Sequence, residues 1–229
     1  MPVYLLNEQP VFPPATEAEP DGLLAIGGDL SVERLISAYS GGIFPWFEEE
    51  NAFFWFSPDP RLVLFPGKIK ISRSLERIIK SGKFEVRMDT AFREVITNCS
   101  KVTRPDGDDS WINKKFIEGY TALHQAGFAH SIEAYYNGKL SGGLYGVSLG
   151  KAFFGESMFH KVTDASKVAF SYLSGKIFDE WNFDFIDCQV ETSHLISMGA
   201  ENISRKKYLE LLAKTLKKRT RKGPWKSEP

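Results

Sequence analysis

Cysteine is scarce in this chain, and its two cysteines form no recognisable metal or disulfide pattern. Cys99 and Cys188 stand alone among 229 residues, with no Cys-x-x-Cys spacing. Both fall at apolar positions, which favours buried free thiols and a reducing compartment. The four histidines show no ligand spacing and no serine or cysteine partner for a triad. We therefore expect structural histidines and no metal site.

Long apolar runs are also missing. No stretch approaches the roughly 20 apolar residues that cross a bilayer, and the first residues lack the basic start of an export signal. We therefore expect a soluble cytoplasmic protein with no membrane partner, and we expect a monomer. Hydrophobic residues make up 42% of the chain and aromatic residues 14%, which is enough for one substantial core.

The chain has no net charge, but its charge is unevenly distributed. Residues 1–60 contain one basic residue, Arg34, against ten acidic ones, so the remainder carries the opposite excess. A basic segment beside an acidic one is compatible with nucleic-acid binding. Ordinary surface solubility explains the same pattern equally well.

Turn-forming residues divide the chain in two. Residues 1–60 are rich in proline and glycine turns and predict a small, irregular α+β module with one short helix over residues 32–39. Residues 61–229 predict helices over 72–80, after 89 and after 113, then a hairpin around Asn137-Gly138 and a third strand over 152–159. A helix over 165–181, a strand over 183–190 and a helix over 205–218 follow. The predicted class is α+β, with a mixed, mostly antiparallel sheet flanked by helices.

This order of elements resembles the acyltransferase fold of the GNAT superfamily, which holds an acyl donor beside an amine on a splayed sheet. The coenzyme A motif of that superfamily, Q/R-x-x-G-x-G/A, is absent. Residues 160–167 read HKVTDASK and contain no glycine. Without glycine the backbone cannot closely approach a pyrophosphate, so acetyl-CoA is disfavoured as a donor.

One carboxylate lies in a very apolar segment, KAFFGESMF, which reads as a core strand over residues 151–159. Removing an ionised carboxylate from water costs several kcal/mol unless something compensates it. Glu156 therefore either pairs with a fixed cation or accepts a cationic guest, and this segment alone leaves both open.

Two further polar residues lie on the strand over 183–190. The period of two places Ile186 and Cys188 on one face and Asp187 and Gln189 on the other. Polar side chains on a core strand need partners, so a satisfied structural network explains the pair as well as a site does. With Glu156 on a neighbouring strand, the combination favours a site.

The helix over 72–80 carries a row of cations. Arg73, Arg77 and Lys80 lie on the face opposite Leu75 and Ile78. Such a row can follow a phosphate backbone, although a merely solvated face is the commoner explanation.

Several long, chemically unusual blocks then occur in a specific order. They are GLLAIGGDLS (22–31), GIFPWF (42–47), SPDPR (57–61), ISRS (71–74), HSIE (130–133), FGESMF (154–159) and IDCQ (186–189). On these blocks the chain resembles the bacterial leucyl/phenylalanyl-tRNA–protein transferase family over nearly its whole length.

The resemblance implies an aminoacyltransferase. Members of this family move Leu or Phe, and less well Met, from aminoacyl-tRNA to the α-amine of proteins that begin with Arg or Lys, which marks those proteins for N-degron degradation. The partners implied are Leu-tRNA, Phe-tRNA and these acceptor proteins. Aminolysis of the ester is downhill, so the resemblance implies no cofactor, metal, nucleoside triphosphate or covalent nucleophile.

The resemblance also implies residue roles. Asp187 would polarise the side-chain amide of Gln189, whose oxygen orients the attacking amine, and Glu156 would stabilise the cationic acceptor end. The implied binding residues are Trp46 and Trp111 around the terminal adenosine, Phe153, Gly155, Met158, Leu173 and Ile186 around the aminoacyl group, and Tyr39, Arg73, Arg77 and Lys80 against the tRNA. Taken singly, each of the apolar residues is more often plain core than pocket, and buried anchoring is the alternative for the tryptophans.

Two other functions remain open from the residues. One is a coenzyme A-dependent N-acyltransferase, which the missing glycine motif argues against. The other is a non-catalytic adaptor that captures basic N-termini through Glu156.

Overall fold

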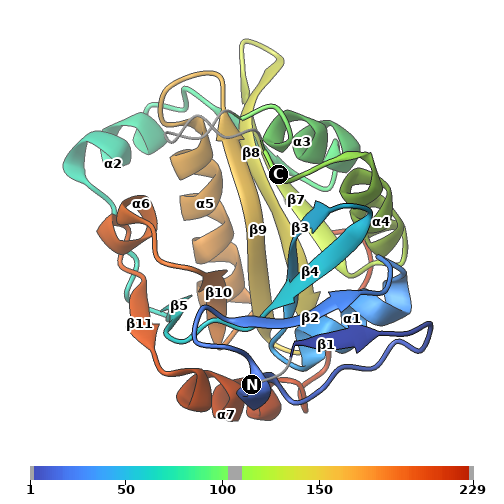
Figure 1. Cartoon of the computed structure of the whole chain (residues 1–229). Helices are drawn as coiled ribbons and strands as arrows, with labels where there is room; N and C mark the ends of the chain where they lie inside the picture. The colour runs from blue at the N-terminus through green and yellow to red at the C-terminus, as the bar shows by residue number, and fades with distance from the viewer. Residues whose placement is uncertain (1–2, 103–109, 227–229) are drawn as a thin grey trace.

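The computed structural model describes residues 3–102 and 110–226 and contains two sheets (Figure 1). Its mixture of helices and sheets confirms the predicted α+β class. In the described residues, no helix has both the length and the apolar character needed to cross a membrane.

The N-terminal segment is more regular than its turns predict. Four strands form a sheet in the order β1-β2-β4-β3; they are β1 (Tyr4–Leu6), β2 (Leu23–Gly27), β3 (Phe44–Glu49) and β4 (Ala52–Phe56). The expectation of an irregular module is therefore wrong. Pro45 lies within β3, where it is tolerated because β3 is an edge strand. A short 3-10 helix, η1 (Ala15–Glu17), and the helix α1 (Val32–Ser40) complete this segment.

The larger sheet has seven strands in the order β11-β5-β10-β9-β8-β7-β6. They are β5 (Arg61–Leu64), β6 (Glu85–Met88), β7 (Ala129–Tyr136), β8 (Lys139–Leu149), β9 (Ala152–His160), β10 (Phe185–Gln189) and β11 (Glu201–Ile203). Neighbouring strands are antiparallel except β9 and β10, which are parallel. Asn137 and Gly138 both have positive φ at the β7–β8 turn, which confirms the predicted hairpin.

Helices cover both faces of this sheet. One face carries α5 (Ala165–Gly175), its π-helical continuation η2 (Lys176–Glu180) and α2 (Arg73–Lys80), packed on a core that includes Leu62, Phe153 and Ile186. The other carries α1, α3 (Phe92–Cys99), α4 (Lys114–Gln125), the smaller sheet and Tyr208 of α7 (Arg205–Thr215), packed on a core that includes Val63 and Phe154. Strands β5 and β11 and the short helix α6 (Ser193–Ser197) lie outside the sequence-based predictions.

Strands β9 and β10 pair in parallel and then separate, and the candidate site lies where they separate. Their last register pair is Phe154 with Asp187, after which β9 continues to His160 while β10 ends at Gln189. Each strand also has a bulge at this level, between Gly155 and Ser157 in β9 and between Asp187 and Gln189 in β10. Bulges bend a strand and redirect its side chains. The sheet is therefore open just beyond the paired residues.

Candidate active site

A cavity of about 670 Å³ lies at this opening and is lined from both faces of the sheet. Most of its wall is apolar or aromatic, and Glu156 and Gln189 are polar groups in its interior. An apolar pocket with a few convergent polar groups is the usual form of a small-molecule or substrate site.

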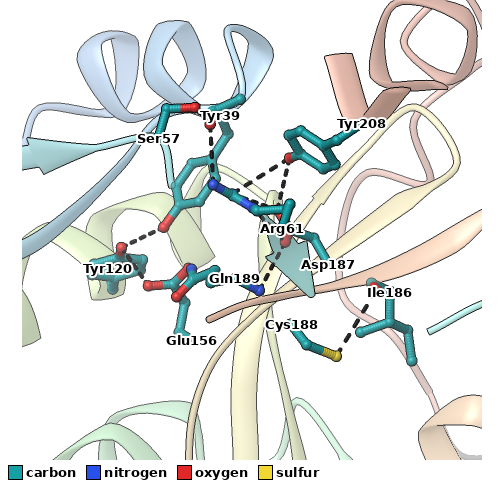
Figure 2. A network of polar contacts seen from close by, with 11 residues as sticks. Tyr39, Ser57, Arg61, Tyr120, Glu156, Ile186, Asp187, Cys188, Gln189 and Tyr208 are labelled. Carbon is teal, nitrogen blue, oxygen red and sulfur yellow. Dashed lines mark hydrogen bonds and ion pairs between the residues drawn. The ribbon is translucent and has the colours of Figure 1, made fainter. Parts of the chain in front are cut away.

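Glu156 has neutral partners rather than a fixed cation. One carboxylate oxygen accepts from Nε2 of Gln189 at 2.8 Å and the other accepts from the hydroxyl of Tyr120 at 2.8 Å (Figure 2). Tyr39 in turn hydrogen-bonds Tyr120. No basic side chain in the described parts of the chain forms an ion pair with this carboxylate. Of the two interpretations of the sequence, the fixed internal cation is therefore not observed.

The same surroundings change the acidity of Glu156. Burial raises the pKa of Glu156 to about 7. The nearby hydroxyls of Tyr39 and Tyr120 and the amide of Gln189 lower this pKa, while the charge of Asp187 raises it further. A carboxyl group with a pKa near neutrality can exchange a proton with an amine at working pH.

Asp187 is held by a different set of groups on the far side of β10. Its carboxylate accepts from Nε and Nη2 of Arg61 at 2.8 and 2.6 Å and from the hydroxyl of Tyr208 at 2.7 Å (Figure 2). The guanidinium lies between the rings of Phe44 and Tyr208, 4.8 and 4.6 Å from their centroids. Asp187 is fully buried and does not line the cavity.

The expected contact between the Asp187 carboxylate and the side-chain amide of Gln189 is not found. Asp187 instead accepts from the backbone N–H of Gln189 at 2.9 Å, and the side-chain amide donates to Glu156. The physical reason is the bulge: Gln189 has φ of 62°, a left-handed conformation that turns its side chain away from Asp187. Asp187 therefore fixes the backbone of Gln189, and Glu156 fixes its amide.

The two cysteines do not add a nucleophile. Cys188 lines the cavity, but burial is the largest of the effects that raise the pKa of its thiol. Burial raises the pKa of the Cys99 thiol to about 12. Both thiols therefore stay protonated at neutral pH, and a protonated thiol is a poor nucleophile.

Most of the predicted binding residues do surround the cavity. Its wall includes Trp46, Trp111, Phe153, Gly155, Met158 and Ile186. Leu173 is an exception, because this residue of α5 is fully buried in the core on the inner side of the helix. Phe170, one turn earlier on the same apolar face of α5, lines the cavity instead.

The predicted tRNA-binding residues differ in accessibility. Arg73 and Arg77 are exposed on α2, as a binding role requires. Lys80 is exposed too, but its Nζ lies 2.6 Å from the carboxylate of Glu76, which offsets part of the stripe's charge. Tyr39 of α1 is fully buried, and its hydroxyl shares a hydrogen bond with that of Tyr120 on α4. It therefore cannot contact a tRNA in this structure.

Besides Phe170, three residues of the polar network lie outside the sequence-based assignment: Arg61, Tyr120 and Tyr208. Arg61 begins the apolar run Arg61-Leu62-Val63-Leu64, and a lone cation at such a position is itself a signal of a buried partner. The two tyrosines lie on apolar helix faces, and nothing in their spacing distinguishes them from ordinary core residues.

Comparisons with known proteins identify the family. A family model described as leucyl/phenylalanyl-tRNA protein transferase matches residues 63–213, and one described as the N-terminal domain of that protein matches residues 28–59. Similar proteins bear the name leucyl/phenylalanyl-tRNA–protein transferase. The one from Myxococcus xanthus is 53% identical over 98% of this chain and 97% of its own length, and the one from Solidesulfovibrio magneticus is 52% identical over 98% and 91%. A third, from Legionella pneumophila, is 52% identical over 93% and 95%.

The family model covers more than half of the chain, and these relatives align with nearly all of it. The predicted resemblance is confirmed. The chain belongs to the leucyl/phenylalanyl-tRNA–protein transferase family.

Proposed function

We propose that this protein transfers Leu or Phe, and less well Met, from aminoacyl-tRNA to the α-amine of proteins that begin with Arg or Lys. The observation that carries the proposal is the pairing of Glu156 with Gln189 at an apolar cavity, with no cation from the described residues to neutralise the carboxylate. The product would be marked for N-degron degradation. The enzyme would act in the cytoplasm as a monomer, with a division near residue 60 between an N-terminal domain and a GNAT-like catalytic domain.

Glu156 is the proton acceptor in this proposal. A protein α-amine has a pKa of about 7.7–8.0 and arrives mostly as an ammonium. Transfer of its proton to a carboxylate with a pKa of about 7 is nearly balanced in free energy. The carboxylate also attracts the cationic end of the acceptor before that transfer.

Gln189 positions the amine that results. Its Nε2 is held by Glu156, while its side-chain oxygen has no partner in the described residues and can accept an N–H from the amine. The amine nitrogen then attacks the ester carbonyl carbon, the bond from that carbon to the ribose oxygen breaks, and the proton lost from nitrogen ends on that oxygen. Asp187 and Arg61 act by fixing the backbone of Gln189.

The donor would occupy the rest of the cavity. Phe153, Met158 and Ile186 provide apolar surface for the side chain of Leu or Phe, and Gly155 leaves room for the ester. Trp46 and Trp111 lie on the side of the N-terminal sheet, where they can stack on the terminal adenosine. Arg73 and Arg77 would meet the tRNA backbone by charge and shape.

A transfer assay tests this function directly. Radiolabelled Leu-tRNA is incubated with the full chain and a protein that begins with Arg, without ATP or coenzyme A. Label should appear in protein and should vanish after RNase treatment. The matched acceptor is the same protein beginning with Asp, which should stay unlabelled because the Glu156 carboxylate repels the acidic first side chain, whereas it attracts that of Arg.

Two other outcomes would replace the proposal. Label transferred from acetyl-CoA would make the protein a coenzyme A-dependent N-acyltransferase. Binding of the Arg-starting protein without any transfer of label would make it an adaptor for basic N-termini.

A further inference from the structure

The helix α5 begins at the wall of the cavity without a side-chain cap. Asp164, the residue before it, has φ of 70° and its side chain caps no backbone N–H. In the described residues, the backbone N–H groups of Ser166 and Lys167 have no partner, since Ala165 and Val168 take the carbonyls of Val162 and Asp164. Such free N–H groups at a helix start favour a negative charge.

The side chain of Ser166 is an independent sign of a ligand at this place. It is 6% exposed and lines the cavity, yet its hydroxyl has no hydrogen-bond partner among residues 3–102 and 110–226. Because this hydroxyl is open to the cavity, a ligand atom there can take the hydrogen bond that no protein group makes.

Charged groups around Ser166 also suit an anion. Lys167 lines the same wall of the cavity. Its Nζ makes one contact, at 3.0 Å with the carboxylate of Asp164. An ammonium has three donors, so it can bind a second group without leaving Asp164. His160 and His194 also face this part of the cavity. Burial lowers the pKa of His194, and the charges of Lys167 and His160 lower it further, so the region repels added positive charge.

We propose that the first turn of α5 binds a phosphodiester group of the donor's 3′-terminal RNA strand. The ligands are the backbone N–H groups of Ser166 and Lys167, the hydroxyl of Ser166 and the ammonium of Lys167. This inference rests on the proposed function, because it takes the donor to be an aminoacyl-tRNA.

The position of the turn relative to Glu156 supports a backbone phosphate rather than the reacting carbonyl. His160 pairs with Gly142, and a Cβ added to Gly142 would meet Ala165, so α5 begins beside the end of β9. Glu156 lies four residues earlier, which is about 13 Å along a strand. That distance is too long for an oxyanion contact and suits a phosphate of the terminal nucleotides.

Beyond the first turn of α5, the RNA strand has a path towards α2. Ile78 and Ile79 of α2 and Val168 and Tyr172 of α5 line one shared pocket, so α2 lies directly against α5. Helix α2, which carries the exposed Arg73 and Arg77, lies on the same side of the large sheet as α5 (Figure 1). An RNA strand that leaves the cavity over the first turn of α5 therefore has these cations within its path.

Binding of a labelled RNA trimer, CpCpA, to the full chain tests the proposal. Ser166→Ala and Lys167→Gln should each weaken binding about tenfold, the usual effect of losing a hydrogen bond to a charged group. Lys167→Gln should also lower the slope of log affinity against log salt by about one. Asp164→Asn should leave binding unchanged or tighten it, because it removes a carboxylate beside the phosphate.

The matched control is Lys207→Gln. Lys207 occupies the same position in the first turn of α7, but that turn is capped by Ser204, and Lys207 is exposed. Its loss should not change the affinity. A trimer with uncharged methylphosphonate linkages should bind the natural chain about tenfold more weakly, and Lys167→Gln should then cause little further loss.

Equal affinity of the natural chain for the charged and uncharged trimers would overturn the proposal, as would natural affinity in both Ser166→Ala and Lys167→Gln. Competition by coenzyme A at the same concentration as CpCpA would assign the turn to a pyrophosphate donor instead. Transfer of label from Leu-tRNA by the natural chain is measured in parallel. If transfer occurs while the trimer results fail, only this inference is lost.

Discussion

Arg61 and Asp187 lie 126 positions apart in the sequence and form a two-point ion pair in the interior of the protein. Their contacts are 2.8 and 2.6 Å, and both side chains are almost fully buried. The pair joins neighbouring strands β5 and β10 behind the cavity. Asp187 also holds the backbone N–H of Gln189, so the pair fixes the end of β10 at which Gln189 enters the site.

Arg61→Met should destabilise the protein strongly. It leaves the Asp187 carboxylate buried without a cation, and removing one partner of a buried pair costs about 3–5 kcal/mol. The free energy of unfolding in urea measures this loss. Arg87→Met is the control, since Arg87 pairs with Glu85 at the surface, and it should change the unfolding free energy little. Similar small losses in both variants would contradict a stabilising role for the buried pair.

The rate of transfer should depend on pH through Glu156. Its pKa is about 7, so the proton-accepting form increases as the pH rises through 7 and the rate should level off above it. Glu156→Gln should lower the rate about 10²–10⁴-fold and remove this rise. Single-turnover rates with Leu-tRNA between pH 5.5 and 9 provide the measurement.

Tyr120→Phe tests the assignment of that pH dependence. The hydroxyl of Tyr120 stabilises the charged form of Glu156, so its loss should move the rise in rate to higher pH. Tyr145 is also buried beside the cavity, but its hydroxyl makes no hydrogen bond in the described residues. Tyr145→Phe should leave the midpoint of the rise in place. Equal midpoints in all three proteins would assign the titration to another group.

Stability should depend on pH through the same residue. The folded-state pKa of Glu156 is about 7, above the ordinary value of 4.5, so the folded protein binds more protons between these values. The natural chain therefore loses stability as the pH rises from about 4.5 towards 7, by at most about 3 kcal/mol. Glu156→Gln lacks this group and should gain stability relative to the natural chain between pH 5 and pH 8. Urea unfolding at both pH values checks the sign, and a constant difference would refute the raised pKa.

Local chemistry explains which parts of this structure the sequence predicts. Asn137 and Gly138 accept positive φ and so determine a hairpin, and Asn113 caps α4 through its own side chain. Glu156 is noticeable because a carboxylate among aromatic residues needs a reason. Each of these inferences depends on residues that are close together in the chain.

The parts that the sequence misses depend on distant packing. Phe170 and Leu173 share one apolar face of α5, and only the fold decides that the cavity ends between them. The bulge at Gln189 breaks the period of two and moves its amide from Asp187 to Glu156. The partner of Asp187 comes from a strand far away in the sequence, so no local pattern identifies it.

The cations of α2 should contribute unequally to tRNA affinity. Arg73→Gln and Arg77→Gln should each weaken binding and lower the salt slope by about one, because each removes a charge from the exposed stripe. Lys80→Gln should have a smaller effect, since Lys80 already pairs with Glu76. Filter binding of tRNA at several salt concentrations measures all three. Equal effects of the three changes would show that the Glu76 contact does not reduce the contribution of Lys80.

Met158 and Leu173 should have different effects despite their similar chemistry. Met158 lines the cavity, so Met158→Ala should change the ratio of kcat/KM for Leu and Phe donors by the equivalent of about 1–3 kcal/mol, the usual value of a methylene or two in a pocket. Leu173 lies in the core beneath α5, so Leu173→Ala should cost about 2–5 kcal/mol of unfolding free energy and leave that ratio unchanged. Donor competition at a temperature where both variants are folded separates the two effects. A changed ratio in Leu173→Ala would place this residue in the pocket, because core destabilisation alone affects both donors equally.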